Sequence, residues 1–279
     1  MELGLSFYLF CSRGLKRRNF QVWVPAWLCK AAKSENTCAV EKGEDVMHIA
    51  EGLLPAPYAI AYSVGAAIFV GAGAKSLARK SREIPMMKQL TGVMTAGVFL
   101  VSLLPIPVPI TGTCSHPGGT PLAAILLGPW VNALVSMVAL LFQALFFAHG
   151  GLTTLGANTL TMGVFGGFVG WLLFKGMRML KMSLFWSGLV AGLIGDISIY
   201  LGTSAQLALA IHGNHPLSEV FLAIFGAFLP TQAPLAVLEG LFTGIALKYI
   251  ADHRPDILIQ LRVLGEGPHP KTESGEGAK

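Results

Sequence analysis

The sequence predicts an all-α, polytopic membrane protein with seven transmembrane helices. Three observations support this: 53% of the 279 residues are hydrophobic, only 13% are charged, and the mean hydropathy is +0.61. Soluble domains carry about 25% charged residues, and a soluble fold of this size cannot bury so much apolar surface. The net charge of +5 therefore reflects loops that face the cytoplasm, and nucleic-acid binding is not expected.

Six apolar runs follow one another after residue 52, and each is long enough to cross a hydrocarbon core of about 30 Å as a helix. They cover residues 53–74, 90–110, 121–147, 152–174, 183–211 and 220–250. The runs lack the two-residue alternation of membrane strands, which excludes a closed β-barrel. The chain is therefore expected to span a membrane several times.

The orientation follows from the positions of the basic residues. Clusters of Lys and Arg, which mark cytoplasmic loops, surround Lys80, Lys175 and Lys248. The loops 111–120 and 212–218 contain neither residue and are expected outside, as is the region around residue 47. An odd number of crossings must then lie between the first outward loop and Lys175, where only two apolar runs are found. A further crossing, or a re-entrant half-helix around residues 123–130, brings the total to seven.

The chain divides into three parts. Residues 47–262 form the predicted transmembrane metal-binding domain, and residues 263–279 form a Gly- and Glu-rich cytoplasmic tail that is expected to be disordered. Residues 1–46 form a polar extension with a poor cleavage site for a secretory signal. We interpret this extension as the result of a start codon assigned too far upstream. The alternative is a leader peptide that is removed.

A chain that begins at Met47 would carry three nitrogen ligands in a row. The free amine and the His48 amide close a five-membered chelate ring on a metal, and the amide and imidazole close a six-membered one. Three in-plane nitrogens favour the tetragonal geometry of late first-row divalent ions over Zn²⁺ or Mg²⁺. If residues 1–46 remain attached, the amine becomes a peptide and this chelate is lost.

A second candidate ligand lies in the outward loop, where His116 stands among small residues. It is expected at the same membrane face as Met47 and is a candidate for the fourth nitrogen. An isolated loop histidine is more often only hydrogen-bonded, so the pairing with His48 carries this hypothesis. Cys114 offers a thiolate that would favour Zn²⁺ or Cu⁺, and loop packing is its simpler interpretation. The four cysteines form no CxxC spacing.

Three motifs resemble one known family. MHIAEGLLP (residues 47–55), TGTCSHP with the following GT (111–117 and 119–120) and HGGLTTLGAN (149–158) are similar to the signatures of the CbiM family. The members of that family are the substrate-specific (S) components of energy-coupling-factor cobalt transporters. The likeness extends from residue 47 to about residue 258 and covers nearly the whole membrane part. Nickel-specific relatives usually begin MHIPDG and lack the Cys-Ser-His-Pro loop.

The resemblance implies a seven-helix S component that captures Co(II) as its transported substrate for cobalamin biosynthesis. It assigns the metal ligands to Met47, His48 and His116. The implied partners are two ATPase subunits, a transmembrane coupling (T) subunit and a small accessory membrane protein. Because the sequence holds no GxxxxGK[ST] phosphate loop, ATP is expected on the separate ATPases.

Other polar and small residues are candidates for supporting roles. Ionisable residues within a membrane are costly and often functional, although they also join helices. Candidates for orienting the ligands are Cys114, Ser115, His149, Asn158 and Asp196. The small residues Ala59, Ser63 and Ala67 resemble the surface of the first helix that docks the T subunit in related components, and the resemblance therefore implies this role, the alternative being internal packing.

Two alternative functions stay open at this point. The first is transport of Ni(II) by the same kind of machine, since Ni²⁺ outranks Co²⁺ at nitrogen sites. The second is an intramembrane metal-dependent hydrolase that uses His116, His149, Asp196 and Glu239. The hydrolase is the weaker alternative because no HExxH pattern places two ligands on one helix face.

Overall fold

The computed structural model describes residue 49 and residues 52–103, 106–108, 113–147 and 149–264. The predicted extension 1–46 and the tail after residue 264 lie outside this part of the chain. The described part ends in a short helix, α11 (Pro255–Gln260), after which Val263 and Leu264 pack against the hydrophobic core. The packed body therefore continues two residues beyond the predicted boundary at residue 262.

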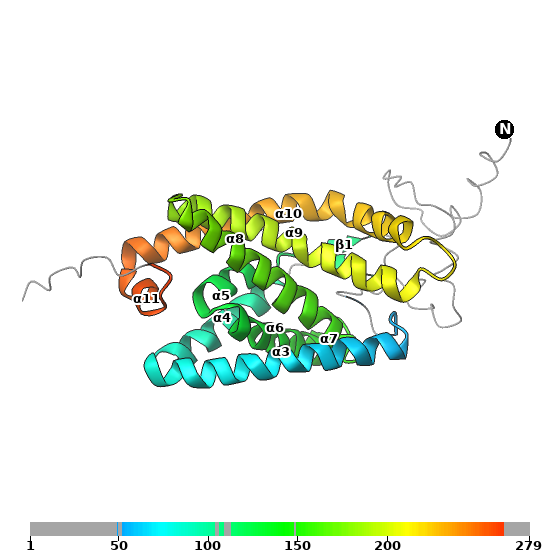
Figure 1. Cartoon of the computed structure of the whole chain (residues 1–279), viewed down its shortest axis with the longest axis horizontal. Helices are drawn as coiled ribbons and strands as arrows, with labels where there is room; N and C mark the ends of the chain where they lie inside the picture. Colours follow the sequence, from blue (N-terminus) through cyan, green and yellow to red (C-terminus); the bar gives the residue numbers. More distant parts are fainter. Residues whose placement is uncertain (1–48, 50–51, 104–105, 109–112, 148, 265–279) are drawn as a thin grey trace, which may run out of the picture.

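Long helices, most of them running along the length of the molecule, dominate the structure (Figure 1). Five helical stretches are long and apolar enough to cross a membrane. They are α3 (Ala56–Glu83), α6 (Pro129–Phe147), the continuous stretch Leu155–Met179, α9 (Leu184–Ile211) and α10 (Leu217–His253). Many of their large apolar side chains are exposed, Ile68 and Phe146 among them, as expected for helices that face lipid.

Two further helices in the described residues are shorter. They are α4 (Met87–Val101), with 15 residues, and α5 (Thr120–Leu127), with eight. The prediction of a polytopic helical protein is confirmed, whereas the count of seven membrane passes stays a prediction. The fold also contains a small antiparallel hairpin, made by β1 (Ile106–Val108) and β2 (Thr113–Ser115). Three prolines, Pro105, Pro107 and Pro109, interrupt the end of the predicted apolar run here, because proline lacks an N–H and disfavours a helix interior.

The short helix α5 is buried at all eight of its residues. It ends at Gly128, whose φ of +90° is accessible to glycine but strained for other residues. The Lys80 ammonium donates to the Leu127 carbonyl over 2.6 Å and so ties the end of α5 to the end of α3. After Gly128 the chain turns back into α6. Helix α5 is therefore a half-length helix close to the predicted re-entrant segment 123–130.

Glycines allow the helices around α5 to approach one another closely. A Cβ atom on Gly192 of α9 would lie 2.8 Å from the Gly240 Cα of α10, and one on Gly188 would lie 3.0 Å from the Gly244 Cα. Such contacts between small residues are a common way for membrane helices to pack without a hydrophobic driving force. Helix α10 continues through Pro230 and Pro234.

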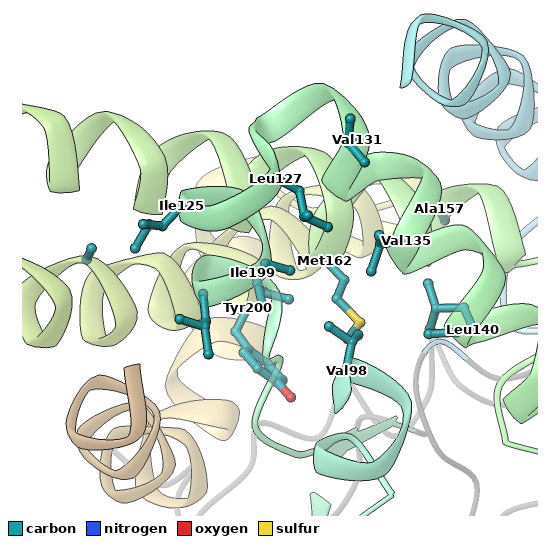
Figure 2. Close-up of a cluster of buried hydrophobic side chains, with 14 of the residues drawn as sticks. Val98, Ile125, Leu127, Val131, Val135, Leu140, Ala157, Met162, Ile199 and Tyr200 are labelled. Atoms are coloured by element: carbon teal, nitrogen blue, oxygen red, sulfur yellow. The ribbon is translucent and has the colours of Figure 1, made fainter. Parts of the chain in front are cut away.

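The core lies where α5 meets the helices that surround it (Figure 2). Ile125 and Leu127 of α5, Val98 of α4 and Tyr200 of α9 are all buried in this cluster. The stretch Leu155–Met179 passes the cluster as α7 (Leu155–Asn158), the π-helix η1 (Thr159–Gly166) and α8 (Gly167–Met179). A π-helical turn often marks a functional region, and this one begins directly after Asn158.

Candidate metal-capture site

The loop between β2 and α5 carries His116, whose side chain is 3% exposed. Helix α9 holds this residue by its backbone. The His116 N–H donates to the Tyr200 hydroxyl oxygen over 2.8 Å, and the same hydroxyl donates to the His116 carbonyl over 3.1 Å. The Tyr200 ring packs edge-on against Phe228 of α10. The position of His116 is thus fixed by two helices that are distant in sequence.

The tautomer of His116 follows from its neighbour. Its Nδ1 lies 3.0 Å from the Pro117 carbonyl oxygen, which can only accept a hydrogen bond. In the neutral ring Nδ1 therefore carries the proton, and Nε2 is the nitrogen that can bind a metal. A backbone carbonyl on the second ring nitrogen is the usual way in which a ligating histidine is oriented.

A second histidine lies next to His116. The ring of His149, which follows α6, is 5.9 Å from the His116 ring between centroids, in an edge-to-face arrangement. Burial lowers the pKa of His116 to about 4, against a smaller raising effect of the Pro117 carbonyl. Burial, and next the charge of His116, lowers the pKa of His149 to about 3. Both rings are therefore neutral at pH 7, the state in which imidazole binds metals.

Ile49, which follows the Met47-His48 pair in the sequence, is anchored to the third motif, the segment that begins with His149. Ile49 is 0% exposed. Its N–H donates to Asn158 Oδ1 over 3.2 Å, and the Thr154 hydroxyl donates to its carbonyl over 2.7 Å. Thr154 and Asn158 lie five and nine residues after His149 in the third motif. Met47 and His48 themselves lie outside the described residues.

The remaining candidate ligand-orienting residues are divided between two places. The Ser115 hydroxyl lies 2.8 Å from the Thr231 hydroxyl of α10, and the Cys114 backbone pairs with Pro107 in the hairpin. Asp196 bonds to Gln232 on α10. Glu239 accepts a hydrogen bond from the Gly119 N–H. Within the described residues no three His, Cys, Asp or Glu side chains form a metal-binding group, so His116, His149, Asp196 and Glu239 do not make the single cluster that the hydrolase alternative requires.

Sequence reasoning missed Tyr200 and Thr231, which hold the loop at His116 and Ser115, and Gln232, which bonds to Asp196. A signal was present in the chain, because Tyr200 lies four residues after Asp196 and therefore on the same face of α9. Within the described part of the chain, no three His, Cys, Asp or Glu side chains are close enough to hold a metal ion together. Any site at His116 thus needs ligands from elsewhere in the chain.

The predicted docking stripe on α3 is divided. Ala59 is buried, whereas Ser63 and Ala67 are exposed, although the backbone of Ser63 packs against Gly156 of α7. Three more small residues on the exposed side continue from Ala67 toward the end of the helix: Gly71, Ala74 and Ala78. The stripe that is open to a partner is thus the second half of α3.

Comparison with known proteins places these features in one family. A family described as "Cobalt uptake substrate-specific transmembrane region" matches residues 48–257. The cobalt transport protein CbiM of Geobacter sulfurreducens is 47% identical over 221 residues, which is 79% of this chain. The match covers 64% of that relative, so this chain spans less than two thirds of its length. The CbiM protein of Sorangium cellulosum is 44% identical over 222 residues, covering 80% of this chain and 99% of the relative.

Solved structures agree with the sequence comparison. A truncated transition metal transporter superposes with a TM-score of 0.65 at 27% identity, covering 74% of this chain and 99% of that one. A second transition metal transporter gives the same score at 25% identity, with coverage of 78% and 100%. The family match covers far more than half of the chain. The resemblance seen in the three motifs is thus confirmed, and the chain belongs to the CbiM family of cobalt-uptake substrate-specific transmembrane proteins.

Proposed function

We propose that this chain is the metal-capturing subunit of an importer for Co²⁺ and has no enzymatic activity of its own. Its ligands are the Met47 amine, the His48 amide and imidazole, and Nε2 of His116. The anchoring of Ile49 carries the proposal. Consecutive Cα atoms are about 3.8 Å apart, so His48 is one step from a residue bonded to Thr154 and Asn158. Those two residues belong to the segment that begins with His149, the neighbour of His116.

The ligand set explains why the site is built from a chain end and a loop. Four nitrogens in one plane suit late first-row divalent ions and exclude the octahedral oxygen geometry that Mg²⁺ requires. His116 supplies the fourth nitrogen from a buried position that the Pro117 carbonyl and Tyr200 hold rigidly. His149 borders the metal and limits the orientations of the His116 ring. We assign the same orienting role to Asn158, through Ile49.

Transport requires partners that this chain does not contain. We propose that two ATPase subunits, a transmembrane coupling subunit and a small accessory membrane protein complete an energy-coupling-factor importer. Small exposed residues on the second half of α3 support a docking face for the coupling subunit, because a Cβ atom on Gly71 would meet nothing within 4 Å. The capture site is placed outside and the C-terminus inside, and the cobalt serves cobalamin biosynthesis.

The binding test compares Co²⁺ and Ni²⁺ on the purified protein by equilibrium dialysis. His48→Ala and His116→Ala should each weaken Co²⁺ binding by more than roughly 10- to 100-fold, which is the typical loss when a residue that only orients a metal ligand is replaced. His215→Ala is the matched control, because His215 is exposed in the loop between α9 and α10. Full affinity in His116→Ala would reject the proposed ligand set. Preference for Ni²⁺ in direct competition would favour the nickel alternative.

The amine ligand is tested separately by the intact mass of the protein purified from its native membrane. A chain that begins Met-His-Ile carries the free amine. If residues 1–46 are still attached in a protein that binds Co²⁺ tightly, the amine cannot be a ligand. The site must then be rebuilt around the two imidazoles.

A further inference from the structure

Two carboxyl groups lie buried behind the loop that carries His116. Asp196 of α9 is 0% exposed and Glu239 of α10 is 1% exposed. The close contact between Gly192 and Gly240 brings their two helices together one turn before Asp196 and one residue after Glu239. Ionisable groups at such positions are expensive in a membrane and are retained for a reason. The capture of a metal by nitrogen ligands does not use either carboxyl group.

Each carboxyl group has one neutral donor. The Gly119 N–H donates to Glu239 Oε1 over 2.9 Å, and the Gln232 amide donates to Asp196 Oδ2. Glu239 Oε2 is buried and has no hydrogen-bond partner within the described residues. Asp196 Oδ1 is also buried, and although the Gly118 backbone lies close to the Asp196 carboxyl group, no donor among the described residues reaches Oδ1 with hydrogen-bond geometry. The two ion pairs of the described chain lie elsewhere, at Arg254–Asp256 and Glu83–Arg262. Two buried carboxylates thus lack a side chain of opposite charge.

Neutral oxygens surround the same point. Thr120 Oγ1 and Gln232 Oε1 are buried without a hydrogen-bond partner in the described part of the structure, as is Thr243 Oγ1. A Cβ atom on Gly118 would lie 3.3 Å from Thr120 Oγ1 and 3.6 Å from Asp196 Oδ1, so these two oxygens converge on one side of the loop. Glu239 reaches the adjacent residue, Gly119. Carboxylate, amide and hydroxyl oxygens together are the ligand set of a hard cation.

We propose that Asp196, Glu239, Gln232 and Thr120 form a second cation site, lined by oxygen, that takes a divalent metal ion. The site rests on the proposed function only in the identity of its natural occupant, the transported ion. Gly119 is three residues from His116, which places their Cα atoms no more than about 11 Å apart. Oxygen ligands hold Co²⁺ less tightly than a chelate of nitrogens, since they suit Mg²⁺, Ca²⁺ and Mn²⁺ best. A weaker site next to the capture loop would bind the ion after it dissociates from its first ligands.

The test measures how many Co²⁺ ions the full chain binds, by equilibrium dialysis against Co²⁺ over a wide concentration range. The wild type should bind one ion tightly and a second at least tenfold more weakly. Asp196→Asn and Glu239→Gln should lose the second ion and keep the first, because both amides preserve the acceptors for Gln232 and Gly119. Glu219→Gln is the matched control, an exposed carboxylate on the same helix as Glu239, and should keep both ions.

The two proposals fail in different ways. His116→Ala should lose the tightly bound ion and keep the weakly bound one. If His116→Ala keeps both ions, the capture site is rejected and the second site is not affected. A weak ion that survives in the Asp196→Asn/Glu239→Gln double variant, or no weak ion in the wild type, overturns the second site. Equal melting temperatures of the variants and the wild type show that a loss of binding is not caused by unfolding. If Glu239→Gln, which alters the acceptor of the Gly119 N–H, does not fold, Asp196→Asn alone serves as the test.

A last pair of measurements separates the sources of the cation. Elemental analysis of the purified chain detects a resident Mg²⁺, which would compete with Co²⁺ for the weak site and disappear in the double variant. Exchangeable Co²⁺ without Mg²⁺ identifies the transported ion as the occupant, and either result supports the site. An infrared band of protonated carboxyl groups that persists in saturating Co²⁺ and is lost in Glu239→Gln overturns it, because the pair then carries protons instead of metal.

Discussion

The hydroxyl of Tyr200 bridges both backbone polar groups of His116, accepting from its N–H at 2.8 Å and donating to its carbonyl at 3.1 Å. One side chain of α9 therefore fixes the peptide plane on either side of the imidazole. A loop position that is buried between helices needs such partners, because an unpaired buried backbone group costs about 1–3 kcal/mol. This contact makes the capture loop depend on α9 and gives a first prediction.

Tyr200→Phe should weaken Co²⁺ binding while the fold persists. Phenylalanine keeps the ring contact with Phe228 but leaves the His116 N–H and carbonyl without their partner. We expect a loss of about 10- to 100-fold in affinity, as for other residues that orient a metal ligand. Dialysis with Co²⁺ measures it. Tyr249→Phe, an exposed tyrosine at the other end of α10, should bind normally. Unchanged affinity in Tyr200→Phe would show that the loop is held by other contacts.

Thr154→Val should loosen the segment that follows His48. Valine has the shape of threonine but cannot donate to the Ile49 carbonyl, which is buried. Metal affinity should fall by about 5- to 100-fold, the equivalent of roughly 1–3 kcal/mol for one unsatisfied group. Thr95→Val removes a hydroxyl bonded only within its own helix and is the control. Equal Co²⁺ affinities in the two variants would argue against a metal site that begins next to Ile49.

Gly128→Ala should destabilise the turn between α5 and α6. Its φ of +90° is unfavourable for alanine, and the new Cβ atom would lie 2.7 Å from the Lys80 ammonium nitrogen that caps α5. The strain is worth about 1–3 kcal/mol. Thermal unfolding in detergent should show a lower midpoint than in Gly92→Ala, where a Cβ atom meets open space in α4. A midpoint equal to that of the control would contradict the left-handed conformation of Gly128.

The metal-free protein should lose stability as the pH falls from about 6.5 toward 4. His116 has a folded pKa of about 4 and His149 of about 3, below the value of 6.5 for an unfolded histidine. In this window the unfolded state binds more protons, so unfolding becomes easier as protons are added. Once the pH is below the folded pKa, the loss is on the order of 3 kcal/mol for His116 and on the order of 5 kcal/mol for His149. His149→Gln should have a flatter profile of melting temperature against pH, and His253→Gln, at an exposed histidine, should not.

Gly71→Leu should separate metal capture from assembly with partners. A Cβ atom on Gly71, on the exposed side of α3, would meet nothing within 4 Å, so a leucine there should leave Co²⁺ binding unchanged. It should block close approach of a partner helix, so the coupling subunit should no longer co-purify. Gly92→Leu places the same bulk at an open position on α4 and should allow assembly. Normal co-purification of Gly71→Leu would move the docking face away from α3.

The sequence identifies features that depend only on composition, on local hydropathy or on short motifs. Low charge and long apolar runs require a membrane, because no soluble fold could bury them, and the three motifs identify the family. The need for an additional pass between His116 and Lys175 also follows from the chain alone, through the positions of its lysines and arginines. The half-helix α5, which ends beside Lys80, lies in that interval, and the number of membrane passes stays a prediction.

Only the tertiary structure decided which side chains face one another. A hydropathy pattern cannot bring His149 to within 5.9 Å of His116, or place Tyr200 and Glu239 against the loop, because each contact joins segments 33 to 120 residues apart. Helical periodicity also did not fix the face of α3 that is buried, so Ala59 lies inside while Gly71 is exposed. Every face of a membrane helix is apolar, and the choice between lipid and protein is made by packing against the neighbouring helices.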